Sequence, residues 1–286
     1  MDMSLLQGAV EAIKTDLEQT IRTAHYNGQA YEDGLRAKEA LIRSQSLIIR
    51  IHEAAKVSIC QELERVTRKF TIHPPLGERG PEVAISGYIK RKRQDIVVLF
   101  GETGLIPEVI TQGPLAGSIN SIGRERSESA IVIGVRSQLS SVGKNFDTLM
   151  ERAFAETLNL RLRLPRLVMG EVYLLPVVEY DDQAMKANRI AWKRGYTPVE
   201  KFIRTFLGIT HRDTGAVTED PYKYERSALI LVDFRQSPPM IFSTLEELKE
   251  AGCISPGFTG DFGLLTPTDF ANDIVSTHRE RHLYLY

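Results

Sequence analysis

Short apolar runs alternate with stretches of helical periodicity in the second half of this sequence. Three runs are bounded by polar residues, as buried strands are: AIVIGV (130–135), VYLLPVV (172–178) and ALILVDF (228–234). Helical patterns follow at 144–160, 199–207, 245–250 and 268–277. This alternation predicts an α/β fold with a mixed central sheet flanked by helices.

The first part of the chain has helical patterns and no strand-like run. One pattern begins at Ser4, and a second follows a turn signal at 25–28 and continues from Leu35 to Val66. We therefore expect two long helices and divide the chain into an N-terminal helical region, 1–70, and an α/β core, 71–286. A scaffold or a dimer interface is the simplest role for such a region.

Two further apolar runs lie at the start of the expected core. VAISGYI (83–89) and DIVVLF (95–100) are separated by a polar segment that includes four consecutive cations, Lys90, Arg91, Lys92 and Arg93. This pattern predicts a hairpin or a pair of adjacent strands. Residues 101–129 are rich in Gly, Ser and Thr, and we expect a loop there.

Composition and motifs exclude several classes of protein. Cys60 and Cys253 belong to no CxxC or Cys/His cluster, which leaves a zinc site without support. The motifs GxxxxGK[ST], GxGxxG after a strand and GxSxG are all absent from the sequence, which argues against a nucleotide-binding enzyme and a serine hydrolase. No segment has the composition of a signal peptide or a membrane span, so we expect no membrane partner and a cytoplasmic location.

The net charge of −1 argues mildly against a nucleic-acid binder, because such proteins often carry a basic balance. Metal-holding carboxylates would offset a basic surface in this sum, so clustering is more informative than the total. The four cations at 90–93 are such a cluster. They suit contact with a DNA backbone, or they form a solvated turn that protects an edge strand from aggregation.

Polar residues gather where the expected strands end. Asp95 begins a strand, AIVIGV leads directly into Arg136 and Gln138, and the next helix offers Lys144 and Glu156. Hydrolysis of a phosphodiester needs carboxylates that hold a divalent metal, an oriented water and a cation for the developing charge. Asp95 and Glu156 suit the metal, Arg136 or Lys144 suits the cation, and Gln138 suits the orientation of water or phosphate.

This order of elements and residues resembles the PD-(D/E)xK nuclease superfamily. The most telling segment is GVRSQLSSVGKNFDTLMERAFAETLNLRLRLPRLVMGEVYLLPVVEYD, which looks like part of a type II restriction endonuclease; with HPPLGERGPEVAISGYIKRKRQDIVVLF the resemblance covers about residues 73–181. It implies a restriction-endonuclease-like fold and Mg²⁺-dependent cleavage of double-stranded DNA. A homodimer acting at a short symmetric site is also implied.

The resemblance assigns roles residue by residue. Gln94-Asp95 stands at the Pro-Asp of the family, so Asp95 matches the metal-binding aspartate. Gly134 stands where the second acid would be and Arg136 where the lysine would be. Because some members carry the second acid on the following helix, the metal pair is expected to be Asp95 and Glu156.

Several residues remain as alternatives within this assignment. Glu151 and Glu171 are the next candidates for the second acid, and either Glu171 or Glu179 suits a supporting role. Lys144 is the alternative to Arg136, and Glu82 resembles an extra glutamate that these folds often carry before the first strand. The rival function is a DNA-binding protein that has the nuclease-like fold but no catalysis, which the missing acid and Arg136 would explain.

Overall fold

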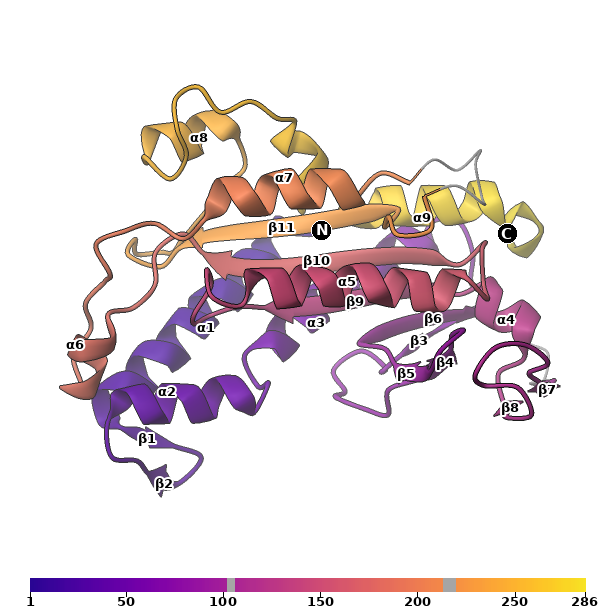
Figure 1. The fold of residues 1–286 in the computed structure, drawn as a ribbon, viewed down its shortest axis with the longest axis horizontal. Helices are drawn as coiled ribbons and strands as arrows, with labels where there is room; N and C mark the ends of the chain where they lie inside the picture. The colour runs from indigo at the N-terminus through magenta and orange to yellow at the C-terminus, as the bar shows by residue number, and fades with distance from the viewer. Residues whose placement is uncertain (102–105, 213–219) are drawn as a thin grey trace.

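A six-stranded mixed sheet forms the centre of the computed structural model, which describes residues 1–101, 106–212 and 220–286 (Figure 1). Its strand order is β12-β11-β10-β9-β6-β3. The strands are β3 (Phe70–His73), β6 (Ile96–Phe100), β9 (Ile131–Ser137), β10 (Val168–Pro176), β11 (Arg226–Asp233) and β12 (Met240–Ile241). Strands β9, β10 and β11 are parallel, and the other pairs are antiparallel. The expected mixed sheet flanked by helices is confirmed.

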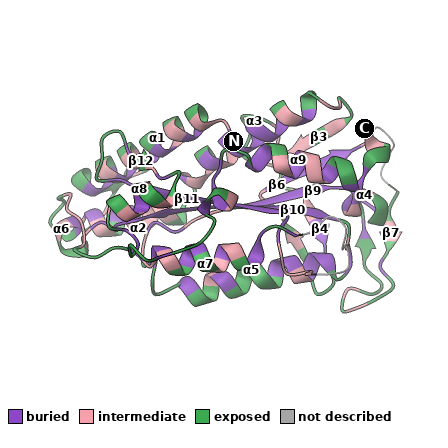
Figure 2. Cartoon of the chain, turned by 90° about the horizontal axis from the view of Figure 1, so that it is seen from above, coloured by how far each residue is buried: buried purple, intermediate pink, exposed green. Residues whose placement is uncertain are grey.

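Helices cover both faces of this sheet, as Figure 2 shows from its edge. One face packs against α1 (Met3–Thr23), α3 (Ile48–Glu64) and α9 (Phe270–Arg281), and the other against α5 (Phe146–Arg161) and α7 (Val199–Ile209). Each face of the sheet has its own hydrophobic core. Successive residues of a strand contribute to the two cores alternately, because their side chains point to opposite faces. In β6, Ile96 and Val98 join the core with α1, and Val97 joins the core with α5.

The N-terminal helices belong to this packing. Apolar residues of α1 and α3, such as Leu17 and Ile59, lie in the same cluster as Ile133 of β9. The second expected helix is in fact two, α2 (Gly34–Arg43) and α3, and a short ribbon of β1 (His25–Tyr26) and β2 (Gln29–Ala30) precedes them. The break follows from local bonding: Ser44 Oγ donates to Leu41 O, and Gln45 adopts a positive φ of 59°.

The expected pairing of 83–89 with 95–100 is wrong. Strand β4 (Ala84–Ser86) pairs with β5 (Arg91–Arg93) in a separate ribbon, so three of the four basic residues form a strand. Strand β6 pairs instead with β3 and β9. This arrangement lets all five residues of β6 enter the buried sheet, while the charged β5 stays at the surface.

The helices expected at 144–160, 199–207, 245–250 and 268–277 are confirmed as α5, α7, α8 (Leu245–Glu250) and α9. Thr244 and Glu247 form a reciprocal capping box that begins α8. The expected loop at 101–129 contains β7 (Glu108–Val109), β8 (Ile119–Asn120) and α4 (Arg124–Glu128), and 102–105 lie outside the described residues. A small helix, α6 (Asp182–Lys186), follows β10. None of the helices in the described ranges has the length and apolar character needed to cross a bilayer.

Candidate functional site

Asp95 lies directly before β6, at the end of the sheet where β9 finishes. The pairing of Ile96 with Ile133 puts Asp95 opposite Gly134 on the neighbouring strand. Its Oδ2 accepts a hydrogen bond of 2.8 Å from the backbone N–H of Val135. The carboxylate therefore provides the acceptor for a backbone N–H of β9 that lies beyond the end of its pairing with β6.

Glu171 on β10 lies opposite Gly134 from the other side. It is completely buried, and its Oε2 has no hydrogen-bond partner in the described part of the chain. A Cβ placed on Gly134 would collide with this oxygen. The carboxylate of Glu171 thus occupies the space that a side chain at 134 would need, so an acid from β10 fills the position that the resemblance expects on β9.

Asp95, Gly134 and Glu171 consequently form a row across three neighbouring strands. Two strand spacings separate the backbones of the two acids by about 10 Å. The side chain of Glu171 extends over Gly134, the residue that lies between the two acids. The negative charge of Asp95 contributes to the raised pKa of Glu171, as expected for neighbouring acids.

A chain of ion pairs runs along one side of this row. Arg136 Nη1 lies 2.7 Å from Oε1 of Glu171, and Arg136 Nη2 contacts Glu156 of α5. Lys92 of β5 contacts the other oxygen of Glu156. Two of the expected catalytic residues, Arg136 and Glu156, are therefore in direct contact, and Glu171 joins them.

The pKa values of Glu171 and Arg136 are both shifted in this network. Burial raises the pKa of Glu171 to about 7, and Glu156 and Asp95 add to this effect against the opposing pull of Arg136 and Lys92. Burial alone would lower the pKa of Arg136, but Glu171, Tyr224 and Glu156 outweigh it and raise that pKa above its ordinary value. Arg136 therefore stays charged, while Glu171 changes its protonation near neutral pH.

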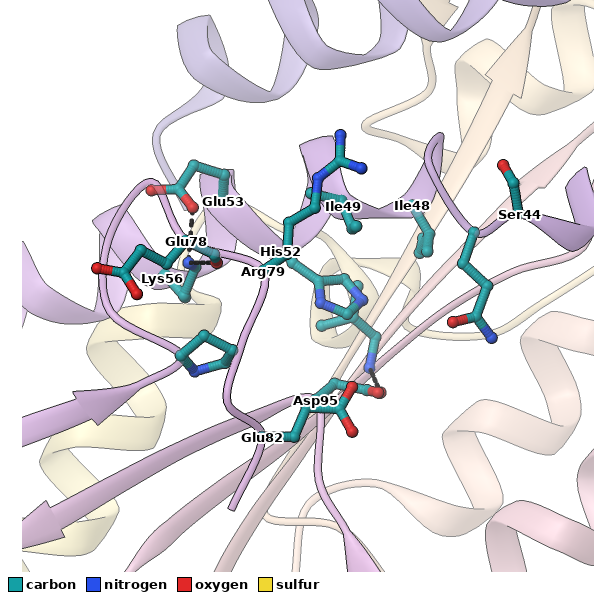
Figure 3. Close-up of a pocket in the computed structure, with 13 residues that line it drawn as sticks. Ser44, Ile48, Ile49, His52, Glu53, Lys56, Glu78, Arg79, Glu82 and Asp95 are labelled. Atoms are coloured by element: carbon teal, nitrogen blue, oxygen red, sulfur yellow. Dashed lines mark hydrogen bonds and ion pairs between the residues drawn. The ribbon is translucent and has the colours of Figure 1, made fainter. Parts of the chain in front are cut away.

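A cavity of about 160 Å³ opens on the α3 side of Asp95 (Figure 3). Charged residues dominate its lining, including Glu82, Glu53 and Lys56. His52 of α3 also faces it, and its Nε2 has no partner among the residues described. Burial lowers the pKa of His52, although the nearby charge of Asp95 opposes this shift. Asp95 is thus reachable from a polar cavity that also contains the expected Glu82.

Other expected site residues lie apart from this cluster. The side chain of Gln138 is used in structural hydrogen bonds: Nε2 donates to Ser141 O of its own loop at 3.0 Å, and Oε1 accepts from Tyr173 of β10 at 3.1 Å. Lys144 is exposed in the turn before α5 and has no ion pair with Asp95 or Glu156 in the described structure. Across 1–101, 106–212 and 220–286, no three His, Cys, Asp or Glu side chains are arranged to hold a metal ion.

The four cations of the basic run separate into two kinds. Lys92 turns inward to Glu156, whereas Lys90, Arg91 and Arg93 are exposed. The alternation follows from the strand conformation of β5, in which successive side chains point to opposite sides. Only the three exposed cations are therefore available to a partner at the surface.

Sequence reasoning placed Glu171 behind Glu156, as a reserve for the second acid or as a supporting residue, and did not single out His52. The signal for Glu171 is present in the sequence, since it is the one charged residue of VMGEVYLLP, a strand buried along its full length. Buried carboxylates require a partner, so such a residue is a functional candidate. For His52 the periodicity of α3 carries no such signal.

The chain matches no protein-family model, and neither the curated proteins nor the solved structures compared with it contain a match.

Proposed function

We propose that this protein is a metal-dependent endonuclease that hydrolyses phosphodiester bonds in double-stranded DNA, as type II restriction enzymes do. The observation that carries the proposal is the row of Asp95 and Glu171 across Gly134, with Arg136 bound to the second acid. Carboxylates and a fixed cation at the end of a central strand are the groups that this hydrolysis requires.

Asp95 and Glu171 are the residues that would hold the cation, which we expect to be Mg²⁺. Arg136 binds only Oε1 of Glu171, so the buried Oε2 has no partner in the described part of the chain and is the oxygen that would face a cation. Mg²⁺ is commonly bound through one or two carboxylates and completed by water and phosphate oxygens, so a third protein ligand is not needed. A bound Mg²⁺ would polarise the phosphate and activate water.

Arg136 has a different role from that of the lysine it replaces. Its guanidinium remains charged at every working pH and cannot remove a proton from water. Its planar donors suit a phosphate oxygen instead, where they would stabilise the charge that develops during hydrolysis. We therefore assign Arg136 to the phosphate and Glu156 to holding Arg136 and Lys92 in position.

Cleavage of a complex DNA, such as a phage genome, tests this function directly. With Mg²⁺ the protein should produce discrete fragments whose mapped ends share one short sequence, and with EDTA it should produce none. A two-fold symmetric site would agree with a homodimer, because a symmetric dimer presents the same contacts to each half-site. Intact DNA at every metal concentration would contradict the proposal.

The pKa of Glu171 predicts that metal binding depends on pH. Because a metal ion binds the deprotonated carboxylate, Mn²⁺ affinity should rise up to about tenfold per pH unit below 7 and level off above it. Glu171→Gln should weaken binding and remove this dependence, whereas Glu151→Gln, an exposed change on α5, should leave both unchanged. Isothermal titration calorimetry between pH 6 and 8 measures the effect.

The same shift gives a second readout without metal. A carboxyl group whose pKa is raised on folding contributes stability that is complete below about pH 4.3 and is lost as pH rises through about 7. Glu171→Gln should remove this decline from the melting temperature measured across that range. An identical decline in the variant would show that Glu171 does not titrate there.

One observation favours the rival function, a DNA-binding protein without catalysis. Arg136 and Lys92 already neutralise Glu156, and Arg136 also contacts Glu171. A metal ion would therefore have to compete with these side chains for the carboxylates. Retention of DNA in a gel without cleavage, at any divalent metal tested, would support this alternative.

A further inference from the structure

The ribbon of β4 and β5 is attached to α5 at its turn rather than left free in solvent. Asn159 of α5 is 4% exposed, and its Oδ1 accepts hydrogen bonds from Ile89 N at 2.8 Å and Lys90 N at 3.1 Å. Its Nδ2 donates to Lys90 O at 3.1 Å, and its backbone carbonyl accepts from Tyr88 N at 2.6 Å. A single residue therefore satisfies four backbone groups of the turn.

Glu156 of α5 and Arg163, which follows the end of α5, extend this attachment. Glu156, three residues earlier, contacts Lys92, and Arg163, four residues later, donates to Ser86 O at 2.9 Å. Glu156 and Asn159 are three residues apart and so share one side of α5. The ribbon is thus held at both strands and at the turn.

Gly87 shows how closely the turn and the helix approach. A Cβ at this position would lie 2.6 Å from Cγ of Asn159 and would force the two apart. Glycine therefore permits the backbone of the turn to reach the asparagine side chain. Because the turn is bonded in this way, its conformation is fixed before any partner arrives.

The outer side of the ribbon carries Arg91 and Arg93 without an ion pair in the described ranges. They are two residues apart on one strand, so their backbones are about 6.7 Å apart and their side chains leave the same face. Two exposed arginines on one face of a strand suit successive backbone phosphates, which bind the planar guanidinium group well.

We propose that the β4–β5 ribbon is a rigid phosphate-contact element for double-stranded DNA, and that Asn159 is the positioning residue that holds it ready. This inference rests on the proposed function and adds the surface by which DNA is held. Preorganisation matters because a mobile turn would lose conformational freedom on binding, which weakens affinity. Arg91 and Arg93 provide the positive charge, and Asn159 holds the backbone of the turn in place through its hydrogen bonds.

Fluorescence anisotropy with a labelled duplex of about 30 base pairs, measured without metal at several salt concentrations, tests this inference. Replacing both arginines, Arg91→Gln with Arg93→Gln, should lower the slope of log affinity against log salt by about two, because each phosphate contact contributes about one. Asn159→Ala keeps both charges, so it should weaken binding about tenfold with little change in that slope.

Matched controls are available in the chain. Asn145→Ala alters an asparagine at the start of the same helix whose side chain makes no capping hydrogen bond. Arg36→Gln with Arg43→Gln removes two exposed arginines from α2. Both controls should bind DNA as the wild type does.

The outcomes separate the inference from the proposed function. Folded Asn159→Ala protein that binds with wild-type affinity would overturn the inference. If that variant fails to fold, Gly87→Ala decides the matter, because the added Cβ displaces the turn from Asn159 while leaving Asn159 itself in place; unchanged affinity would again overturn the inference. No DNA binding by the wild type would overturn the proposed function and, with it, the role of the ribbon.

Discussion

Asp95→Asn should reduce DNA cleavage by about three orders of magnitude while the protein remains folded and binds DNA. The size of the effect follows from losing one charged group that acts on the transition state, which typically costs about 10²–10³ in rate. The fold should survive because asparagine keeps an oxygen that can accept the hydrogen bond from Val135 N. Single-turnover cleavage of a mapped fragment measures the loss.

Asp147→Asn is the matched control, since Asp147 is an aspartate on α5 whose side chain is 81% exposed. It should cut at the wild-type rate. Wild-type cleavage by Asp95→Asn protein would remove Asp95 from the site. A comparison of Glu171→Gln with Glu156→Gln then identifies the second acid: the row across Gly134 predicts the larger loss for Glu171, whereas the resemblance alone predicts it for Glu156.

The part of the fold that sequence predicts well is the part governed by local periodicity. The apolar face of α5 and the uninterrupted apolar run of β11 each specify an element that must be buried on one side or on both. Nearest-neighbour spacing carries this information, and no knowledge of distant partners is needed. The helices on both sides of the sheet follow from it.

Pairing between distant segments is what the sequence leaves open. The strand β3 is only four residues long and half-buried, and its partner β6 is more than twenty residues away, so neither period nor turn chemistry identifies the pair. The basic segment looked like a turn because Arg91, Lys92 and Arg93 are charged. The ribbon that contains this segment is held by Glu156, Asn159 and Arg163, which lie far along the chain, on α5 and just after its end.

The candidate site shows the same division. Asp95 and Arg136 were found because they lie at the ends of predicted strands, and Glu156 because it lies on the polar side of a predicted helix; Arg136 and Glu156 are in contact. The role of Glu171 depends on the register of β9 and β10. Only the pairing of Gly134 with Glu171 shows that the Glu171 side chain occupies the space beside the glycine. A shift of one residue would place Glu171 on the opposite face, and sequence alone does not determine that register.

A second buried carboxylate, Glu225, holds together the opposite end of the parallel strands. It is completely buried in charge contact with three arginines: Oε2 lies 2.5 Å from Arg161, and Oε1 lies 2.8 Å from Arg281 and 3.3 Å from Arg212. Oε2 also accepts from Met169 N at 2.6 Å. Burial alone would raise the pKa of Glu225, but Arg161 and Arg281 outweigh it and lower that pKa below its ordinary value.

Glu225→Gln should therefore lower the free energy of unfolding by about 3–5 kcal/mol, the usual loss when one partner of a buried ion pair is removed. Glutamine keeps the shape of the side chain and one acceptor, so the loss reports charge rather than a cavity. Urea unfolding at pH 7 measures it, with Glu246→Gln on the exposed side of α8 as the control. A change below about 1 kcal/mol would contradict the assignment.

The pH dependence and a second substitution distinguish charge from packing. Because the folded pKa of Glu225 is lowered, its stabilisation is present above about pH 4.3 and is lost as pH falls through the folded pKa. The wild type should thus lose more stability in acid than Glu225→Gln protein does.

Arg161→Met in the Glu225→Gln background should recover part of the loss, because it removes a buried guanidinium whose Nε and Nη1 already lack partners in the described structure. Further destabilisation by that second change would contradict the expectation that an uncompensated charge on Arg161 causes the loss.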